Sequence, residues 1–179
     1  LPVFRRSEDF HQGADALHGA GGEWRVERQR LSWEILEAYR EAMVQAGIPP
    51  TDDFNRGDNH GAGFFEVNQR RGVRWSASKG FLKPVMHRHN LTVVTDASVN
   101  RVRFDGHRAT GVELVRGGET EHAAARVETI LAAGAIGSPQ ILQISGIGAP
   151  DWLGELGIPV LQAREGVGRN LQDHLQQRA

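Results

Sequence analysis

Cysteine is absent from the 179 residues of this sequence. Disulfide bonds, thiolate-bound metals and cysteine nucleophiles are therefore excluded for this chain, which fits a reducing compartment. An excess of one charge is also lacking, because the formal net charge is −1. This balance gives no reason to expect nucleic acid or an anionic membrane surface as a partner. No apolar run approaches the roughly 18 residues expected of a membrane span.

The ends of the sequence lack the features of a complete protein. Leu1 stands where an initiator methionine would be, no basic-then-apolar leader follows it, and Ala179 comes directly after a motif. We therefore expect the chain to be a middle piece of a longer polypeptide. Its composition, 39% hydrophobic and 24% charged residues, is that of an ordinary globular protein with enough residues for one core.

Glycine is plentiful, with 22 residues, and the glycine-containing segment 133–148 (AGAIGSPQILQISGIG) is the most informative part of the chain. The apolar run 129–132 before it predicts a buried strand of a parallel sheet. Ser138 and Pro139 predict the N-cap and first residue of a helix that continues over 140–144. A strand, a glycine turn and a helix N-terminus in this order form the usual nucleotide site of α/β proteins.

The other predicted elements indicate a mixed α/β (α+β) fold. A helix with one buried apolar face is predicted from Ser32, as its cap, to Gly47, which ends it. Residues 51–72 indicate a long loop and residues 77–87 a second helix. The rest is a β-meander, with strands predicted over residues 91–95, 98–104, 110–115 and 121–127 and turns at Asp105-Gly106 and Gly117-Gly118.

The segment 133–148 closely resembles the second sequence pattern of the glucose–methanol–choline (GMC) oxidoreductases, a family of FAD-dependent enzymes that oxidise alcohols. Three other segments resemble blocks of the same family in the same order. They are RWSASKGFL at 74–82, NLTVVT at 90–95 and GVGRNLQDHL at 166–175. Because four blocks in order are far more specific than one, the chain is identified as a member of this family.

The resemblance implies part of an FAD/NAD(P)-binding-type domain with a β-meander, together with a piece of the substrate domain. It assigns residues 1–88 to the substrate-side domain, 89–165 to the FAD-binding domain, and 166–179 to a linker that returns toward the flavin site. In this family an alcohol, here choline or another primary alcohol, gives hydride to FAD and becomes an aldehyde. The family's catalytic histidine lies further toward the C-terminus. We therefore expect no catalytic residue in this chain, and a piece that alone neither turns over alcohol nor retains FAD tightly.

Three residues are the cofactor-binding candidates that the resemblance implies. In this family, a valine nine residues after an Asn-Leu pair presents its backbone to the adenine, and counting from Asn90 gives Val99. Ala133 and Gly134 belong to a segment that lies along the FAD in the family. Purely structural roles stay open. Val99 can be a buried strand valine, and Gly134 can be a glycine that allows close packing of a helix on a strand.

Other motifs are better explained by structural roles than by ligand binding or catalysis. Gly61-Ala62-Gly63 and Gly166-Val167-Gly168 begin like a dinucleotide fingerprint but lack its third glycine, so we interpret both as loops. His87-Arg88-His89 has no further ligand at metal spacing, so no metal is expected. Asp173-His174 is interpreted as structural, because adjacent side chains rarely face each other.

The expected partners are a small-molecule alcohol and an electron acceptor, without nucleic acid. The expected location is the cytoplasm, with peripheral association of the intact protein with the inner membrane left open. Two other functions also stay open at this point. One is a non-enzymatic α/β interaction module in which the glycine turn only packs. The other is an NAD-linked dehydrogenase, which needs the complete fingerprint that this chain lacks.

Overall fold

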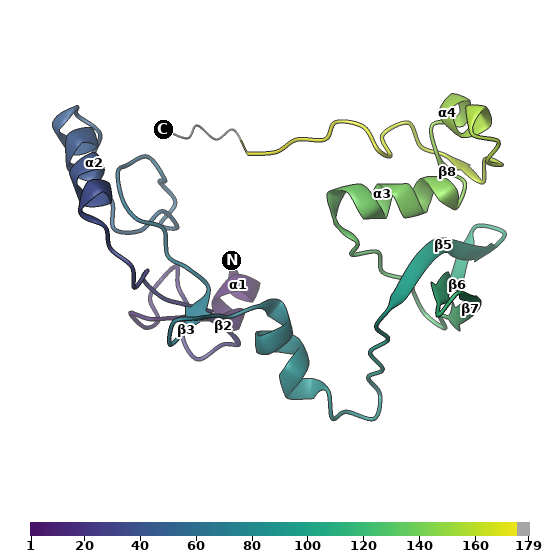
Figure 1. Ribbon diagram of the computed structural model, residues 1–179, viewed down its shortest axis with the longest axis horizontal. Coiled ribbons are helices and arrows are strands. Elements are labelled where there is room, and N and C mark those ends of the chain that lie inside the picture. Colours follow the sequence, from purple (N-terminus) through teal and green to yellow (C-terminus); the bar gives the residue numbers. More distant parts are fainter. Residues whose placement is uncertain (175–179) are drawn as a thin grey trace. The chain divides into compact units, whose positions relative to one another are not determined.

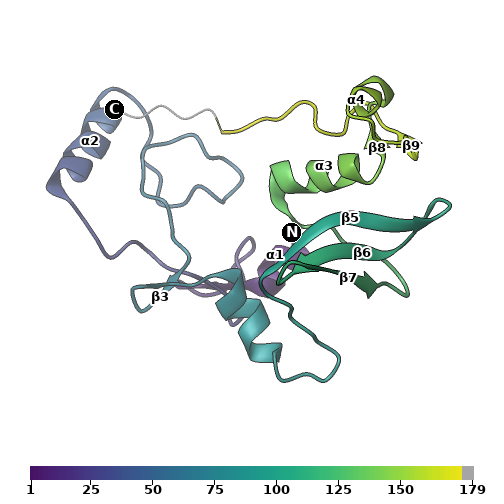
Figure 2. The ribbon, with the colours of Figure 1, turned by 45° about the vertical axis from the view of Figure 1, so that its right-hand side comes forward.

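The computed structural model describes residues 1–174, and the chain forms two compact units, Leu1–Val93 and Val94–Ala179. Both units combine helices with small sheets (Figures 1 and 2), which confirms the predicted mixed fold class. Within the described part of the chain, every helix is too short or too polar to cross a bilayer.

The first unit has two helices and two pairs of short strands. β1 pairs with β2 in parallel, and β3 pairs with β4 antiparallel. A π-helical turn (η1) and a 3₁₀ turn (η2) occupy most of the segment predicted as one helix over 77–87, because Pro84 has no N–H with which to continue α-helical hydrogen bonding. The elements are α1 (Pro2–Ser7), β1 (Glu8–Phe10), β2 (Trp24–Val26), α2 (Glu34–Gln45), β3 (Gln69–Arg70), β4 (Val73–Arg74), η1 (Ser78–Leu82) and η2 (Lys83–Val85).

A buried histidine forms the centre of the first unit. His18 is 3% exposed, and its ring stacks on Phe10 with ring centroids 4.1 Å apart. Its Nδ1 lies 3.2 Å from both carboxylate oxygens of Glu8, and its Nε2 lies 2.9 Å from Oδ2 of Asp53. The guanidinium of Arg56 pairs with the same Oδ2 at 3.1 Å. The core of this unit therefore contains a charged cluster beside the buried apolar residues Phe10 and Ala62.

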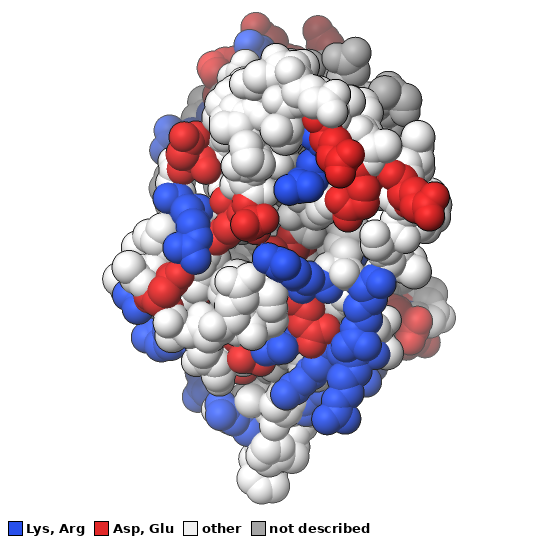
Figure 3. Space-filling model, turned by 90° about the vertical axis from the view of Figure 1, so that its left-hand side faces the viewer, with Lys and Arg blue, Asp and Glu red and all other residues white. Residues whose placement is uncertain are grey.

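Charges also mix on the surface. Arg25 of β2 pairs with Asp9 of β1 and with Glu27, both at 3.1 Å, and so cross-links the two strands. Figure 3 shows acidic and basic side chains interspersed over one face of the molecule, apart from a group of Lys and Arg toward its lower right. Interspersed charges of both signs agree with the balanced composition.

Helix α2 ends as predicted, but it is not buried. Gly47 follows it with a φ of +93°, the left-handed conformation that lets glycine end a helix. The N-cap is Trp33 rather than Ser32, and no residue of α2 is buried. The predicted buried face is therefore wrong, and Ile35 is 69% exposed. The reason is visible in Figures 1 and 2, where α2 stands clear of the strands of its own unit.

The second unit is a β-meander with two helices beside it. β5, β6 and β7 form an antiparallel sheet in that order, which confirms the predicted meander. α3 lies alongside β5 in both ribbon views, and β8 pairs with β9 in parallel. The elements are β5 (Ala97–Asp105), β6 (Arg108–Arg116), β7 (Glu119–Ala124), α3 (Gly134–Ile144), β8 (Ile147–Gly148), α4 (Pro150–Glu155) and β9 (Gln162–Ala163).

Aliphatic side chains form the core of the second unit. Val102 of β5 and Leu114 of β6 are 6% and 7% exposed, and Leu153 of α4 is completely buried. Ala149, which precedes α4, is also buried. Among the described residues of this unit, none with a charged side chain is buried, so apolar packing replaces the charge pairing of the first unit.

Two predicted strands and one predicted helix start are wrong. The runs 91–95 and 129–132 are irregular and pair with no described strand; a strand needs a neighbour for its N–H and C=O groups, and apolar character alone does not supply one. α3 begins at Gly134, and Pro139 lies inside it. Ser138 does not cap a helix that starts after it, because its Oγ accepts the N–H of Ala133 at 2.9 Å.

Candidate functional site

Val99 lies on β5 where the strand changes its register with β6. The pairing shifts by one residue between Val99 and Arg101, which leaves Asn100 as an extra residue in a β-bulge. The side chain of Val99 is half-buried, as expected for a strand valine.

The bulge turns the backbone of Val99 toward the free edge of β5. Successive residues of a strand direct their N–H and C=O groups to alternate sides. On β6, Leu114 and Val112 are two residues apart, so their backbone N–H and C=O groups point to the same side of the strand. Their partners on β5 are Val99 and Val102. The N–H of Val102 points away from β6, since it donates to a side chain at the end of α3. The N–H and C=O of Val99 therefore point to that edge, where no strand among residues 1–174 pairs with β5.

The N-terminus of α3 presents backbone donors. Ala133 is its N-cap and Gly134 its first residue. Gly134 has a φ of +84°, and a Cβ added there would meet no atom within 4 Å. The first N–H groups of an α-helix have no partner within the helix and carry partial positive charge. The N–H of Ala133 donates to the Oγ of Ser138. The N–H groups of Gly134 and the two residues after it are therefore the ones that an anionic group could bind.

Two side chains attach α3 to its surroundings. Ser145, directly after the helix, accepts the N–H of Val102 with its Oγ at 2.8 Å. The Nε2 of Gln143 donates to the carbonyl oxygen of Val167 at 3.2 Å. A Cβ on Gly168 would lie 2.6 Å from that Nε2, and the φ of +80° at this residue also favours glycine. The helix thus joins β5 to the turn around Val167.

The structure brings the predicted cofactor-binding residues onto neighbouring elements. Val99 lies on β5, and Ala133 and Gly134 lie at the start of α3, which packs against β5. Sequence reasoning missed Ser145, although the sequence offers a signal for it: a serine directly before Gly146, at the end of the predicted helix.

The other sequence motifs have local roles. Gly63 packs so closely on Thr51 that a Cβ would lie 2.1 Å from the carbonyl oxygen of Thr51, which confirms a loop glycine. The carboxylate of Asp173 accepts the backbone N–H of His174 at 2.8 Å, and it is not paired with the ring. The end of the fourth motif and of the predicted linker, residues 175–179, lies outside the described residues. Residues 1–174 contain no cluster of three or more His, Asp or Glu able to hold a metal ion.

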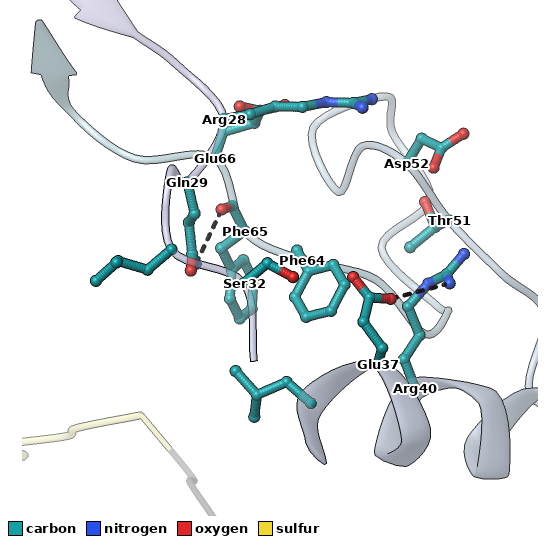
Figure 4. Close-up of a pocket in the computed structure, with 12 residues that line it drawn as sticks. Arg28, Gln29, Ser32, Glu37, Arg40, Thr51, Asp52, Phe64, Phe65 and Glu66 are labelled. Atoms are coloured by element: carbon teal, nitrogen blue, oxygen red, sulfur yellow. Dashed lines mark hydrogen bonds and ion pairs between the residues drawn. The ribbon is translucent and has the colours of Figure 1, made fainter. Parts of the chain in front are cut away.

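The first unit contains a cavity of about 300 Å³ beside α2 (Figure 4). Phe64 and Phe65 lie between its polar groups, with Arg28 on one side and Arg40 and Glu37 on another. Cavities of this size that combine aromatic and polar walls are typical small-molecule sites. The lining residues are Arg28, Gln29, Leu31, Ser32, Leu36, Glu37, Arg40, Thr51, Asp52, Phe64, Phe65 and Glu66.

The charges around this cavity are mostly paired with one another. Arg40 lies 3.8 Å from Glu37, and Arg28 lies 3.8 Å from Oε1 of Glu66. The same Oε1 lies 3.1 Å from Nε2 of His11, whereas Oε2 of Glu66 is buried without a hydrogen-bond partner. The cavity therefore has little free charge with which to select a ligand, and one buried oxygen that lacks a donor.

Comparison with known proteins decides the family. The family model described as GMC oxidoreductase matches residues 2–176. The chain belongs to the GMC oxidoreductase family. Mitochondrial choline dehydrogenase of Homo sapiens is 44% identical over 176 residues, which are 98% of this chain and 30% of that protein. The oxygen-dependent choline dehydrogenase of Pectobacterium atrosepticum is 45% identical over 178 residues, 98% of this chain and 32% of the relative.

Solved structures agree with this GMC membership. Pyridoxine 4-oxidase from Mesorbium loti has a TM-score of 0.91 and 34% identity, over 97% of this chain and 34% of that one. An FAD-dependent oxidoreductase from Chaetomium thermophilum has a TM-score of 0.88 and 31% identity, over 97% of this chain and 32% of that one. The chain thus spans about a third of the length of the GMC proteins that it matches.

Proposed function

We propose that this chain is the part of an FAD-dependent GMC oxidoreductase that binds the adenine side of FAD, in an enzyme that oxidises choline or another primary alcohol to an aldehyde. The observation that carries the proposal is the similarity to choline dehydrogenases along 98% of the chain. Bound FAD supplies the hydride acceptor of such a reaction.

The described residues fit this cofactor. The backbone N–H and C=O of Val99 form a donor–acceptor pair at the free edge of β5, which suits the edge of an adenine ring. The N–H groups that begin α3 suit a phosphate or another anionic group. The buried hydroxyl of Thr129, in the segment before α3, has no hydrogen-bond partner and is available to a bound group. In this proposal Val99, Ala133 and Gly134 hold and orient FAD, and no catalytic proton transfer is assigned to this chain.

Three parts of the chain then have different tasks. We propose residues 1–88 as substrate-side structure, residues 89–165 as part of the FAD-binding domain and residues 166–179 as the linker toward the flavin. The cavity beside Phe64 and Phe65 supports the first assignment, and the fit of β5 and α3 to FAD supports the second. The proposed partners are a small alcohol and an electron acceptor, and the proposed location is the cytoplasm, with peripheral attachment to the inner membrane still open.

The test uses the protein expressed from its complete coding sequence. We expect it to be purified with flavin absorbance and to reduce an artificial electron acceptor when choline or a primary alcohol is added. Comparing choline with ethanol and an aryl alcohol identifies the substrate class. A complete protein that neither retains nor binds added FAD would contradict the proposal, as would full activity without any flavin.

A further inference from the structure

We propose that Ser145 is a positioning residue for FAD binding: it locks α3 to β5 and so holds the backbone of Val99 in place for the adenine. This inference rests on the proposed function and assigns a role to a residue that does not itself touch the cofactor. It follows from the hydrogen bonds of one hydroxyl group.

The Ser145 hydroxyl makes two hydrogen bonds at once. Its Oγ donates to the carbonyl oxygen of Ile141 at 2.5 Å, which fixes the direction of the hydroxyl hydrogen within the last turn of α3. The same Oγ accepts the N–H of Val102 at 2.8 Å. With the hydrogen directed at Ile141, a lone pair of the oxygen is presented to β5. The helix end and the strand are therefore joined through one shared atom.

The bond to β5 matters because Val102 is buried. Val102 is 6% exposed, so its N–H has few other acceptors within reach if the hydroxyl of Ser145 is removed. A buried N–H without a partner is strongly unfavourable. β5 would then have to shift to find another acceptor, and a shift of this strand moves its whole free edge.

Val99 is the residue of that edge for which a ligand is proposed, and it lies close to the hydrogen bond between Val102 and Ser145. It lies three residues from Val102, and the bulge at Asn100 makes both residues face the same edge. Because the orientation of Val99 depends on an irregular strand rather than on regular pairing, its backbone is more sensitive to a displacement of β5. Ser145 therefore acts on the adenine contact through β5, while α3 keeps its own fold.

The experiment compares Ser145→Ala with wild type in the protein expressed from its complete coding sequence. FMN, which lacks the adenosine monophosphate half of FAD, serves as the second ligand. We expect Ser145→Ala to weaken FAD binding about tenfold, the size of effect typical of one lost buried hydrogen bond. FMN binding should change little, so the preference for FAD over FMN falls by a similar factor. A general loss of structure would weaken both ligands alike.

Two matched variants complete the test. Ser145→Thr keeps the hydroxyl and should restore the wild-type preference for FAD. Thr110→Val removes a hydroxyl that donates to the carbonyl oxygen of Arg103 within the same sheet at 3.2 Å, without a bond to Ser145, and should leave the preference unchanged. The inference fails if Ser145→Ala keeps the wild-type preference, if it loses FAD and FMN equally, or if Ser145→Thr behaves like Ser145→Ala. If the wild type itself binds no FAD, the proposed function fails instead.

Discussion

The core of the first unit is a histidine held between two carboxylates, whereas the core of the second is made of aliphatic side chains beneath a β-meander. Charge pairing makes the first unit depend on protonation, since a buried histidine between Glu8 and Asp53 contributes most when it is charged. The apolar core of the second unit has no buried charged side chain among the described residues and so no such dependence. One chain of balanced charge thus contains one core that depends on protonation and one that does not. In the proposed function, the pH-insensitive core supports the cofactor.

Removing the central histidine should give the largest effect on the first unit. His18→Ala leaves the carboxylates of Glu8 and Asp53 without their shared partner, and breaking a buried charge cluster costs about 3–5 kcal/mol. Hydrogen exchange measured peptide by peptide on the complete protein should show the loss in residues 8–26 and not in the β-meander. His60→Ala, at an exposed histidine, is the control. It should change the opening free energies obtained from hydrogen exchange by less than about 0.5 kcal/mol. Equal loss in both units would refute the separation of the two cores.

The matching change in the second unit is Leu153→Ala. This side chain is 0% exposed, and its truncation leaves a cavity that costs about 2–4 kcal/mol. Exchange should increase in β8, α4 and β9, with the first unit unchanged. Leu156, three residues further along, is 53% exposed, and Leu156→Ala should cost well under about 1 kcal/mol. Similar costs for the two leucines would show that the second unit lacks the aliphatic core described above.

A smaller effect is expected at the proposed cofactor side of the second unit. Gly134→Ala places a side chain at a φ of +84°, which costs about 1–2 kcal/mol although the space for a Cβ is open. The backbone should relax and move the first N–H groups of α3, so FAD affinity should also fall. Gly154→Ala, at a helical glycine with equal space, should instead be neutral or stabilising by up to about 1 kcal/mol. Thermal unfolding and FAD titration of both variants measure the difference.

The smallest effect should come from pH alone. Burial of the His18 ring opposes its protonation, but the hydrogen bonds and charges of Glu8 and Asp53 outweigh burial and raise the pKa of His18 above its usual 6.5. A raised pKa stabilises the folded state fully below pH 6.5, and this stabilisation is lost as the pH rises through the folded-state value. Opening free energies from hydrogen exchange, corrected for the intrinsic exchange rate, should therefore decrease in the first unit above pH 6.5. They should stay level in the second unit, and His18→Ala should abolish the decrease.

Local signals in the sequence predicted local structure well. The turns at Asp105-Gly106 and Gly117-Gly118 located the meander because a turn is specified by the residues that form it. Gly47 ended α2 for the same reason. Family resemblance pointed to Val99, Ala133 and Gly134, and the structure places them on two elements that pack together.

Features that depend on distant partners could not be predicted in this way. The run 129–132 has the composition of a buried strand, but strand formation requires a neighbour, and none is paired with it among residues 1–174. The cluster around His18 joins residues 8, 18 and 53, which no local pattern relates. The bulge at Asn100 and the bond from Val102 to Ser145 likewise arise only when β5 meets β6 and α3.

The most direct test of the account is a structure of the protein, expressed from its complete coding sequence, with FAD bound. The account predicts that the adenine ring is hydrogen-bonded to the backbone N–H and C=O of Val99 at the free edge of β5. It also predicts that the N-terminus of α3, at Gly134, faces the same FAD molecule. An adenine bound elsewhere, with Val99 paired to another strand at that edge, would contradict the account.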